Sequence, residues 1–173
     1  MRALLSAWVL AALWGSAWAV DENIIFSGVL FDEPCVLAVE DSTLVVDFKG
    51  VVNKDLYLNG RTRSSSFEMH LNGCDREVEK RTVSIKFVGR ESDEVPGFLA
   101  LDGAGAHGLL VGLEEKEGKH LPLNKSILLE KLAGGDNVVS FNAYLRGTPE
   151  ALSSHSLGLG AFEGTITFTF MYE

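Results

Sequence analysis

The side chains that most often carry chemistry are scattered along this 173-residue chain. Its four histidines lack the HxxxH or HxH spacing of a metal site and lie in separate stretches, at His70, His107, His120 and His155. Each is interpreted as a surface or strand-end histidine. The acidic pairs Asp93-Glu94 and Glu114-Glu115 are interpreted as solvated loop charges. These patterns favour neither a metal site nor an acid–base pair.

Two further stretches resemble catalytic motifs only superficially. Residues 102–108 (DGAGAHG) lack the Lys and Ser or Thr that end a phosphate-binding loop, and the apolar run that follows is a strand candidate. We interpret them as a hairpin turn. There is no GxSxG motif, and Ser153-Ser154-His155 is interpreted as a polar loop. The sequence therefore predicts a protein that is not an enzyme and needs no cofactor.

The first 19 residues have the pattern of a secretory signal peptide. A positive Arg2 precedes an apolar run over 3–13, and Ala17-Trp18-Ala19 is a small-x-small cleavage site. The alternative, a membrane anchor, is disfavoured because the run is too short to span a bilayer. We expect cleavage after Ala19, export, and no membrane insertion. Loss of Arg2 leaves 14 basic against 24 acidic residues, which argues against nucleic acid as a partner.

The two cysteines, Cys35 and Cys74, would then lie in an oxidising compartment. Two cysteines in such a setting usually pair, so we expect a disulfide. The alternative is two free buried thiols.

The elements that must position these residues are short and alternate with turns. Gly, Pro, Asn and Asp turn residues separate nine candidate strands, namely Ile24–Phe31, Leu44–Phe48, Ser66–Leu71, Thr82–Val88, Phe98–Leu101, Leu109–Leu113, Ile127–Leu129, Val138–Arg146 and Ala161–Tyr172. One helical turn is expected at Asn53 to Tyr57. The pattern predicts a single all-β sandwich. A typical immunoglobulin domain has a core tryptophan between its cysteines, and this chain has none there.

The last candidate strand has an apolar face without a later strand to cover it. Its large apolar residues share one parity, namely Phe162, Ile166, Phe168, Phe170 and Tyr172. Such an edge favours pairing with another strand. Near the start of the chain, Ile24, Phe26, Gly28 and Leu30 also share one parity. Either this first strand covers the last one within the same molecule, or it covers the last strand of another molecule.

The chain resembles the pilins of the chaperone–usher pathway over essentially its whole mature length. The motifs that carry the resemblance are Phe26-Ser27-Gly28, then Cys35, then the F-x-x-x-L-x-x-C stretch from Phe67 to Cys74, the Gly-rich turn Gly105 to Leu109, Gly160, and the alternating final strand with penultimate Tyr172. The stretches LFDEPC and TPEAL are most similar to a minor tip adaptor subunit of P-pilus type.

The resemblance implies an incomplete immunoglobulin-like sandwich that lacks its last strand. Residues 1–19 would be the signal peptide, 20–30 a donor-strand extension and 31–173 the pilin domain. Ile24, Phe26, Gly28 and Leu30 would be donated to a neighbouring subunit. The strand beside the resulting groove would comprise Gly160, Phe162, Ile166, Phe168, Phe170 and Tyr172. The Cys35–Cys74 disulfide would match that of the family.

The partners implied are a periplasmic pilus chaperone, an outer-membrane usher and neighbouring pilin subunits. The expected function is a structural subunit of a surface pilus that supports cell adhesion. The alternative is a self-complete secreted sandwich of adhesin type, whose residues 20–30 fold back into their own groove and which binds a ligand.

Overall fold

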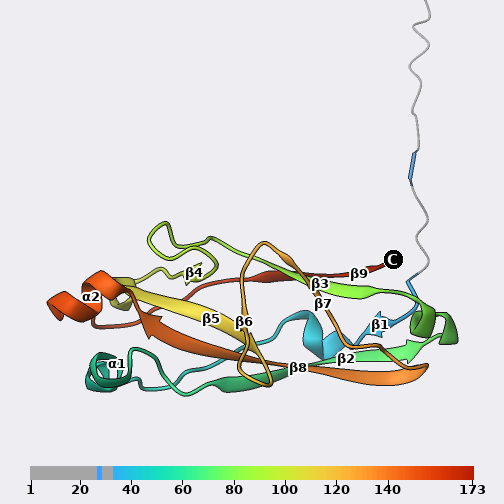
Figure 1. The fold of residues 1–173 in the computed structure, drawn as a ribbon, viewed down its shortest axis with the longest axis horizontal. Helices are drawn as coiled ribbons and strands as arrows, with labels where there is room; N and C mark the ends of the chain where they lie inside the picture. The colour runs from blue at the N-terminus through green and yellow to red at the C-terminus, as the bar shows by residue number, and fades with distance from the viewer. Residues whose placement is uncertain (1–26, 29–32) are drawn as a thin grey trace, which may run out of the picture. The chain divides into compact units, whose positions relative to one another are not determined.

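The computed structural model describes Ser27, Gly28 and residues 33–173. From residue 33 onward the chain forms two β-sheets packed face to face (Figure 1). The predicted β-sandwich is therefore confirmed. The predicted signal peptide over 1–19 lies outside the described residues, as do Ile24, Phe26 and Leu30 of the predicted donor strand.

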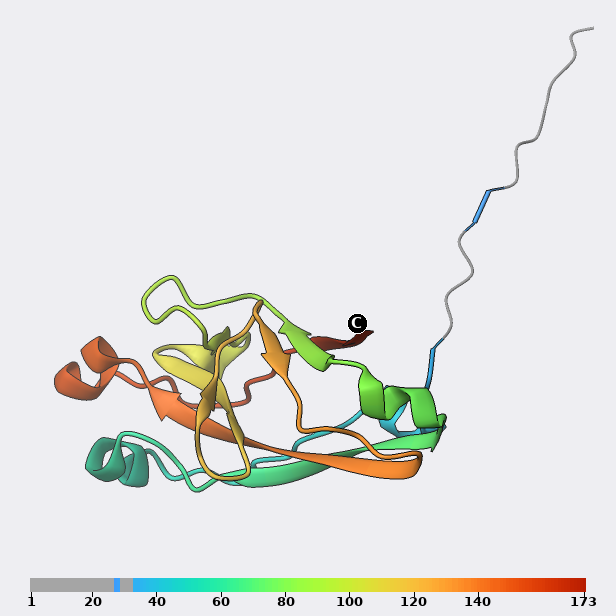
Figure 2. The same cartoon turned by 45° about the vertical axis from the view of Figure 1, so that its right-hand side comes forward.

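The larger sheet, sheet A, has the order β1-β2-β8-β5-β4, with β6 paired to β5, and all its pairs are antiparallel. Its strands are β1 (Val36–Leu37), β2 (Ser65–Cys74), β4 (Leu99–Ala100), β5 (Leu109–Glu115), β6 (His120–Leu121) and β8 (Gly135–Gly147). Sheet B has the order β7-β3-β9, with β3 (Val83–Val88), β7 (Ser126–Leu128) and β9 (Thr167–Tyr172). Figure 2 shows β2 and β8 in one layer and β3 and β7 in the other.

The core lies between the two sheets and follows the two-residue period of the strands. Phe141 and Leu145 point inward from β8, and Ile85 and Phe87 point inward from β3. Leu145 and Ile85 are fully buried, and the Phe87 and Phe141 rings meet edge to face with centroids 5.2 Å apart. Burial of each such side chain contributes about 1.5–3 kcal/mol, so these residues hold the sandwich closed.

The predicted helical turn is confirmed as α1 (Asn53–Asn59). Leu56 anchors it in the core, and it ends at Gly60, whose φ of 73° is a left-handed conformation that suits glycine. The described residues also contain three short 3-10 helices, namely η1 (Val39–Ser42), η2 (Arg76–Lys80) and η3 (Ala104–Ala106).

A second helix, α2 (Pro149–Ser154), was not predicted. The Thr148 hydroxyl accepts a hydrogen bond from the Ala151 N–H, and Pro149 opens the helix. A threonine cap followed by proline is a helix-start pattern, and it was the signal available. Helices α1 and α2 lie at the same end of the domain (Figures 1 and 2), where the Leu157 N–H donates to the Tyr57 hydroxyl at 3.1 Å.

The predicted disulfide is confirmed between Cys35 and Cys74. It joins the start of β1 to the end of β2 across a sequence separation of 39 residues. Closing a loop of that length stabilises the fold by about 4 kcal/mol, because it lowers the conformational entropy of the unfolded chain. In the part of the chain that the structure describes, no helix is long and apolar enough to cross a membrane.

Candidate functional site: an apolar groove beside the last strand

An apolar groove of about 810 Å³ opens beside β9 and reaches the core of the sandwich. One wall is the extended segment 43–48, and the other is the segment 162–168, which leads into β9. The floor is made of core side chains from both sheets, namely Phe67, Met69, Phe87, Leu99, Leu101, Val111, Leu113 and Ala143. The site is therefore a long apolar surface suited to binding an extended apolar segment.

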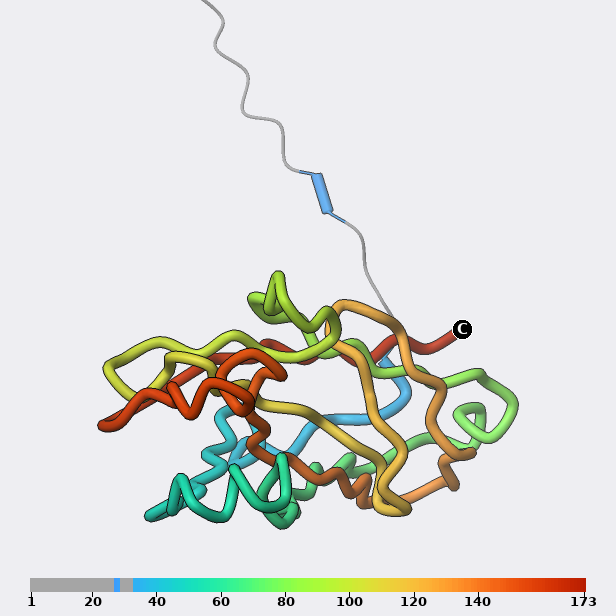
Figure 3. Tube along the Cα trace, turned by 60° about the vertical axis from the view of Figure 1, so that its left-hand side comes forward, coloured from blue at the N-terminus to red at the C-terminus, as the bar shows by residue number. Residues whose placement is uncertain are grey.

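Strand β9 has β3 as its partner and stands at the edge of sheet B among the described strands. Phe168 lies opposite Phe87, Phe170 opposite Ile85, and Tyr172 opposite Val83. Figure 3 shows the red trace of β9 running along the green trace of β3. The predicted alternation is confirmed, because the β9 threonines are exposed and its aromatic residues are half-buried. A further strand that covered these half-buried aromatic side chains would bury more of their apolar surface and so stabilise the protein.

The aromatic and aliphatic residues predicted for the groove strand lie in two places, and Gly160 lies in a third. Phe162, Ile166 and Phe168 line the groove. Phe170 and Tyr172 pack against the buried cluster around the disulfide, where burial raises the pKa of Tyr172. A role in recognition stays a prediction for all of them.

Gly160 lies in a tight turn away from the groove lining. Its φ is 125°, which favours glycine, and a Cβ on Gly105 would lie 2.3 Å from its carbonyl oxygen. The predicted strand Ala161–Tyr172 is shorter in the structure, because its pairing with β3 begins only at Thr167. Between Gly160 and Thr167, Glu163 pairs with Asp102 through two reciprocal backbone hydrogen bonds.

The opposite wall corresponds to the predicted strand Leu44–Phe48. Its alternation is real, because Leu44, Val46 and Phe48 are half-buried against the core while Val45 is 85% exposed. The segment is extended, but it pairs with no strand in the described part of the chain. The periodicity revealed the buried face and could not reveal that the hydrogen-bonding partner is absent.

The interpretation of Glu114 as a solvated loop charge is wrong. It lies in β5 and is only 4% exposed, and its carboxylate oxygens accept hydrogen bonds from Nη2 of Arg61 at 3.0 and 3.1 Å. The Ser64 hydroxyl also donates to it. The Arg61 guanidinium in turn lies 3.4 Å from the centroid of the Tyr144 ring. Arg61 was not singled out from the sequence, and only the pairing of distant strands brings it to Glu114.

Three histidines make contacts that the sequence did not indicate. His70, on β2, binds the buried carboxylate of Asp41 through its ring Nδ1 at 2.9 Å. His120 stacks on Phe98 with centroids 4.3 Å apart. His155 ends α2 with a φ of 55° and contacts Tyr57, so the interpretation of residues 153–155 as a loop is wrong. Among the described residues, no three His, Cys, Asp or Glu side chains gather as metal ligands.

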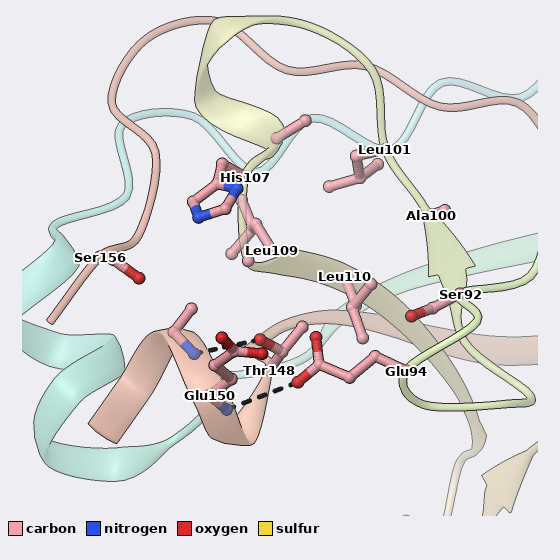
Figure 4. A pocket seen from close by; sticks show the side chains of 13 residues that line it. Ser92, Glu94, Ala100, Leu101, His107, Leu109, Leu110, Thr148, Glu150 and Ser156 are labelled. Atoms are coloured by element: carbon pink, nitrogen blue, oxygen red, sulfur yellow. Dashed lines mark hydrogen bonds between the residues drawn. The ribbon is translucent and has the colours of Figure 1, made fainter. Parts of the chain in front are cut away.

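A second, smaller cavity of about 240 Å³ lies between α2 and the turn that contains His107 (Figure 4). There the Glu94 carboxylate accepts the Glu150 N–H at 3.4 Å. The turn joins β4 to β5 as a hairpin, as predicted. Its Gly108 packs against α2, because a Cβ there would lie 2.2 Å from the Cβ of Ala151. The glycines of this motif therefore permit close packing of the turn.

Comparison with known proteins agrees with this architecture. Residues 24–173 match the family described as fimbrial protein. The chain is 31% identical to the fimbrial adapter PapK of Escherichia coli, over 96% of this chain and 97% of that protein. It is also 31% identical to the fimbrial-like protein YfcP of Escherichia coli K12, over 98% and 93%. The major MR/P fimbria protein of Proteus mirabilis is 29% identical, over 95% and 93%.

Solved pilus structures share the fold. The P pilus rod subunit PapA superposes with a TM-score of 0.70 at 20% identity, over 82% of this chain and all of that chain. A subunit from the structure of a chaperone–usher pilus gives a TM-score of 0.68 at 20% identity, over 92% and 99%. The sandwich is thus the immunoglobulin-like fold of these pilins. The chain belongs to the fimbrial protein family.

Proposed function

We propose that this protein is a structural subunit of a chaperone–usher pilus, and that its groove receives an extended strand from another protein. The observation that carries the proposal is the apolar groove between 43–48 and the segment leading into β9. Strand addition fits such a site, because the strand edge supplies backbone hydrogen bonds and the floor supplies side-chain pockets. A catalytic role has no comparable support.

The strand donated by this chain to its neighbour is residues 24–30. Burying Ile24, Phe26 and Leu30 in a neighbouring groove would contribute about 1.5–3 kcal/mol each. Gly28 would seat where the two backbones approach most closely. A slip of one residue would turn the apolar face outward, so the register is strongly specified.

The expected route begins with export to the periplasm, where a pilus chaperone fills the groove. At the outer-membrane usher, the extension of the next subunit replaces the chaperone strand. Such a head-to-tail contact does not close on itself and therefore yields a fibre at the cell surface. The identity to PapK, which is named a fimbrial adapter, favours a minor adaptor role at the pilus tip.

The groove is tested by two substitutions one residue apart. Phe168→Asp places a charge in the groove, whereas Thr169→Asp places the same charge on the exposed side of β9. Each variant is produced in the periplasm together with a pilus chaperone, and the chaperone that copurifies is measured. We expect Phe168→Asp to lose the chaperone and Thr169→Asp to retain it.

Produced in the periplasm without a chaperone, the mature chain is expected to aggregate, whereas at high dilution in vitro it should stay in solution with its groove open. A stable monomer whose residues 20–30 are protected from hydrogen exchange would overturn the proposal in favour of the self-complete secreted sandwich. Deletion of residues 20–30 should leave chaperone binding intact and abolish addition to a preceding subunit. Replacement of Gly28 by Val should do the same, with Ser27→Val as its control.

A further inference from the structure

Just before the wall 43–48, one backbone hydrogen bond of the β1–β2 ladder is replaced by a hydrogen bond to a side chain. β1 pairs with β2 at Val36 with Asn72 and at Leu37 with Leu71. The next pair in this register is Ala38 with His70, and the Ala38 N–H does donate to the His70 carbonyl at 2.9 Å. The reciprocal bond, from the His70 N–H to the Ala38 carbonyl, would complete an ordinary antiparallel pair.

The Ala38 carbonyl instead accepts the Asp41 N–H at 3.0 Å and so closes the turn of η1. The His70 N–H donates to Oδ2 of the Asp41 side chain. A carboxylate thus replaces a backbone carbonyl at the point where the chain leaves sheet A. Asp41 is 4% exposed, and the same oxygen also contacts Nδ1 of His70 at 2.9 Å. Without this acceptor the His70 N–H would be left unpaired when the edge strand departs.

The wall begins two residues after Asp41. Because hydrogen bonds fix the turn of η1 at both ends, they fix the position and orientation in which the chain enters the wall. In that orientation Leu44, Val46 and Phe48 face the core and Val45 faces outward. At the other end, Asp47 Oδ1 accepts the Lys49 N–H at 2.7 Å, and Lys49 takes a φ of 57°.

We infer that Asp41 is a positioning residue for strand capture, because its carboxylate sets the position and orientation of the groove wall formed by residues 43–48. This inference rests on the proposed function of the groove. Asp41 does not line the groove itself, so it acts through the backbone of the wall. The bond to the backbone N–H is the essential one, and the His70 ring supports it.

The test compares four variants of the mature chain, each refolded at low concentration with the disulfide intact. Asp41→Ala removes the acceptor, and Asp41→Asn retains one. His70→Ala removes the ring and keeps the backbone N–H. Glu40→Ala is the matched control, because Glu40 is an exposed carboxylate in the same turn. The first readout is tryptic cleavage after the exposed Lys49 at the end of the wall, identified by mass spectrometry.

We expect Asp41→Ala to speed cleavage after Lys49 about tenfold or more, as expected for loss of one hydrogen bond to a charged group. Asp41→Asn should restore most of the protection, and His70→Ala should have the smaller effect. Glu40→Ala should match the wild type. Equal cleavage in Asp41→Ala and the wild type would overturn the inference. Equal effects of Asp41→Ala and His70→Ala would show an ion pair, and would overturn the role given to the backbone bond.

The second readout is capture of a labelled peptide with the sequence of residues 20–32 as the donor strand. We expect Asp41→Ala to weaken capture about tenfold or more while far-ultraviolet circular dichroism stays unchanged. If the wild type captures the peptide and Asp41→Ala captures it equally well, the inference fails and the proposed function stands. If the wild type does not capture the peptide, the proposal that the groove receives such a strand is overturned. The rate of cleavage after Lys49 then still tests whether Asp41 positions the wall.

Discussion

Nη2 of Arg61 donates to both carboxylate oxygens of Glu114, at 3.1 and 3.0 Å, on the outer side of sheet A. Glu114 is almost fully buried, whereas the Arg61 side chain is 39% exposed. A buried charge that loses its partner is strongly destabilising, although the exposure of Arg61 limits the effect.

We therefore expect Arg61→Met to lower the free energy of unfolding by about 1–3 kcal/mol. Urea unfolding of the disulfide-intact chain measures this change. Arg63→Met is the matched control, because Arg63 is exposed two residues away and its replacement should have little effect. Equal stability of the two variants would contradict the structural role given to this pair.

Gly112 lies beneath the rings of Tyr144 and Phe98. A Cβ at this position would lie 2.6 Å from Cζ of Tyr144 and 2.7 Å from Cε1 of Phe98. We expect Gly112→Ala to destabilise the fold by about 1–3 kcal/mol, because both rings must move. Gly50→Ala is the control, because a Cβ at Gly50 meets no atom within 4 Å. Thermal unfolding of both variants measures the difference.

His120 makes stability depend on pH. Burial lowers its pKa, and the positive charges of Arg146 and Arg61 add to this, whereas the Leu113 carbonyl and Glu114 oppose it. The folded state therefore favours the neutral ring. The contribution of the neutral His120 ring to the free energy of unfolding is therefore fully present above the ordinary histidine pKa of about 6.5. It decreases as the pH falls from there through the lower pKa of the folded state.

The measurement is urea unfolding between pH 5 and pH 8, roughly centred on the ordinary histidine pKa. His120→Phe keeps a ring against Phe98 and removes the titrating group. This variant should lose part of the decline at low pH. An unchanged profile in His120→Phe would assign the decline to other groups.

The Cys35–Cys74 disulfide is expected to stabilise the fold. We expect replacement of both Cys35 and Cys74 by Ser to remove about 4 kcal/mol of stability. Unfolding in denaturant, with and without reducing agent, measures this loss. Reduction of the wild type should reproduce the effect of the double variant, and a variant as stable as the oxidised wild type would contradict it.

Much of the sandwich was predictable because strand periodicity is a local property. The alternation of Phe168 and Phe170 with threonines located β9, and the cysteines located the disulfide. The unpaired state of 43–48 was not predictable, because hydrogen-bond partners are set by topology. The burial of Glu114 was equally hidden, because Arg61 comes to it from 53 residues away. Asp41 was not singled out from the sequence, because only the β1–β2 ladder brings its carboxylate to the His70 N–H.

The two walls of the groove have a mechanical consequence. Residues 43–48 and β9 both present backbone that pairs with no strand on the groove side in the described chain. A strand lying between them would be an interior strand with neighbours along both edges. Tension along a fibre joined in this way would pull that strand lengthwise, so its hydrogen bonds would resist together in shear. A joint of this kind withstands force far better than one that opens bond by bond from an end.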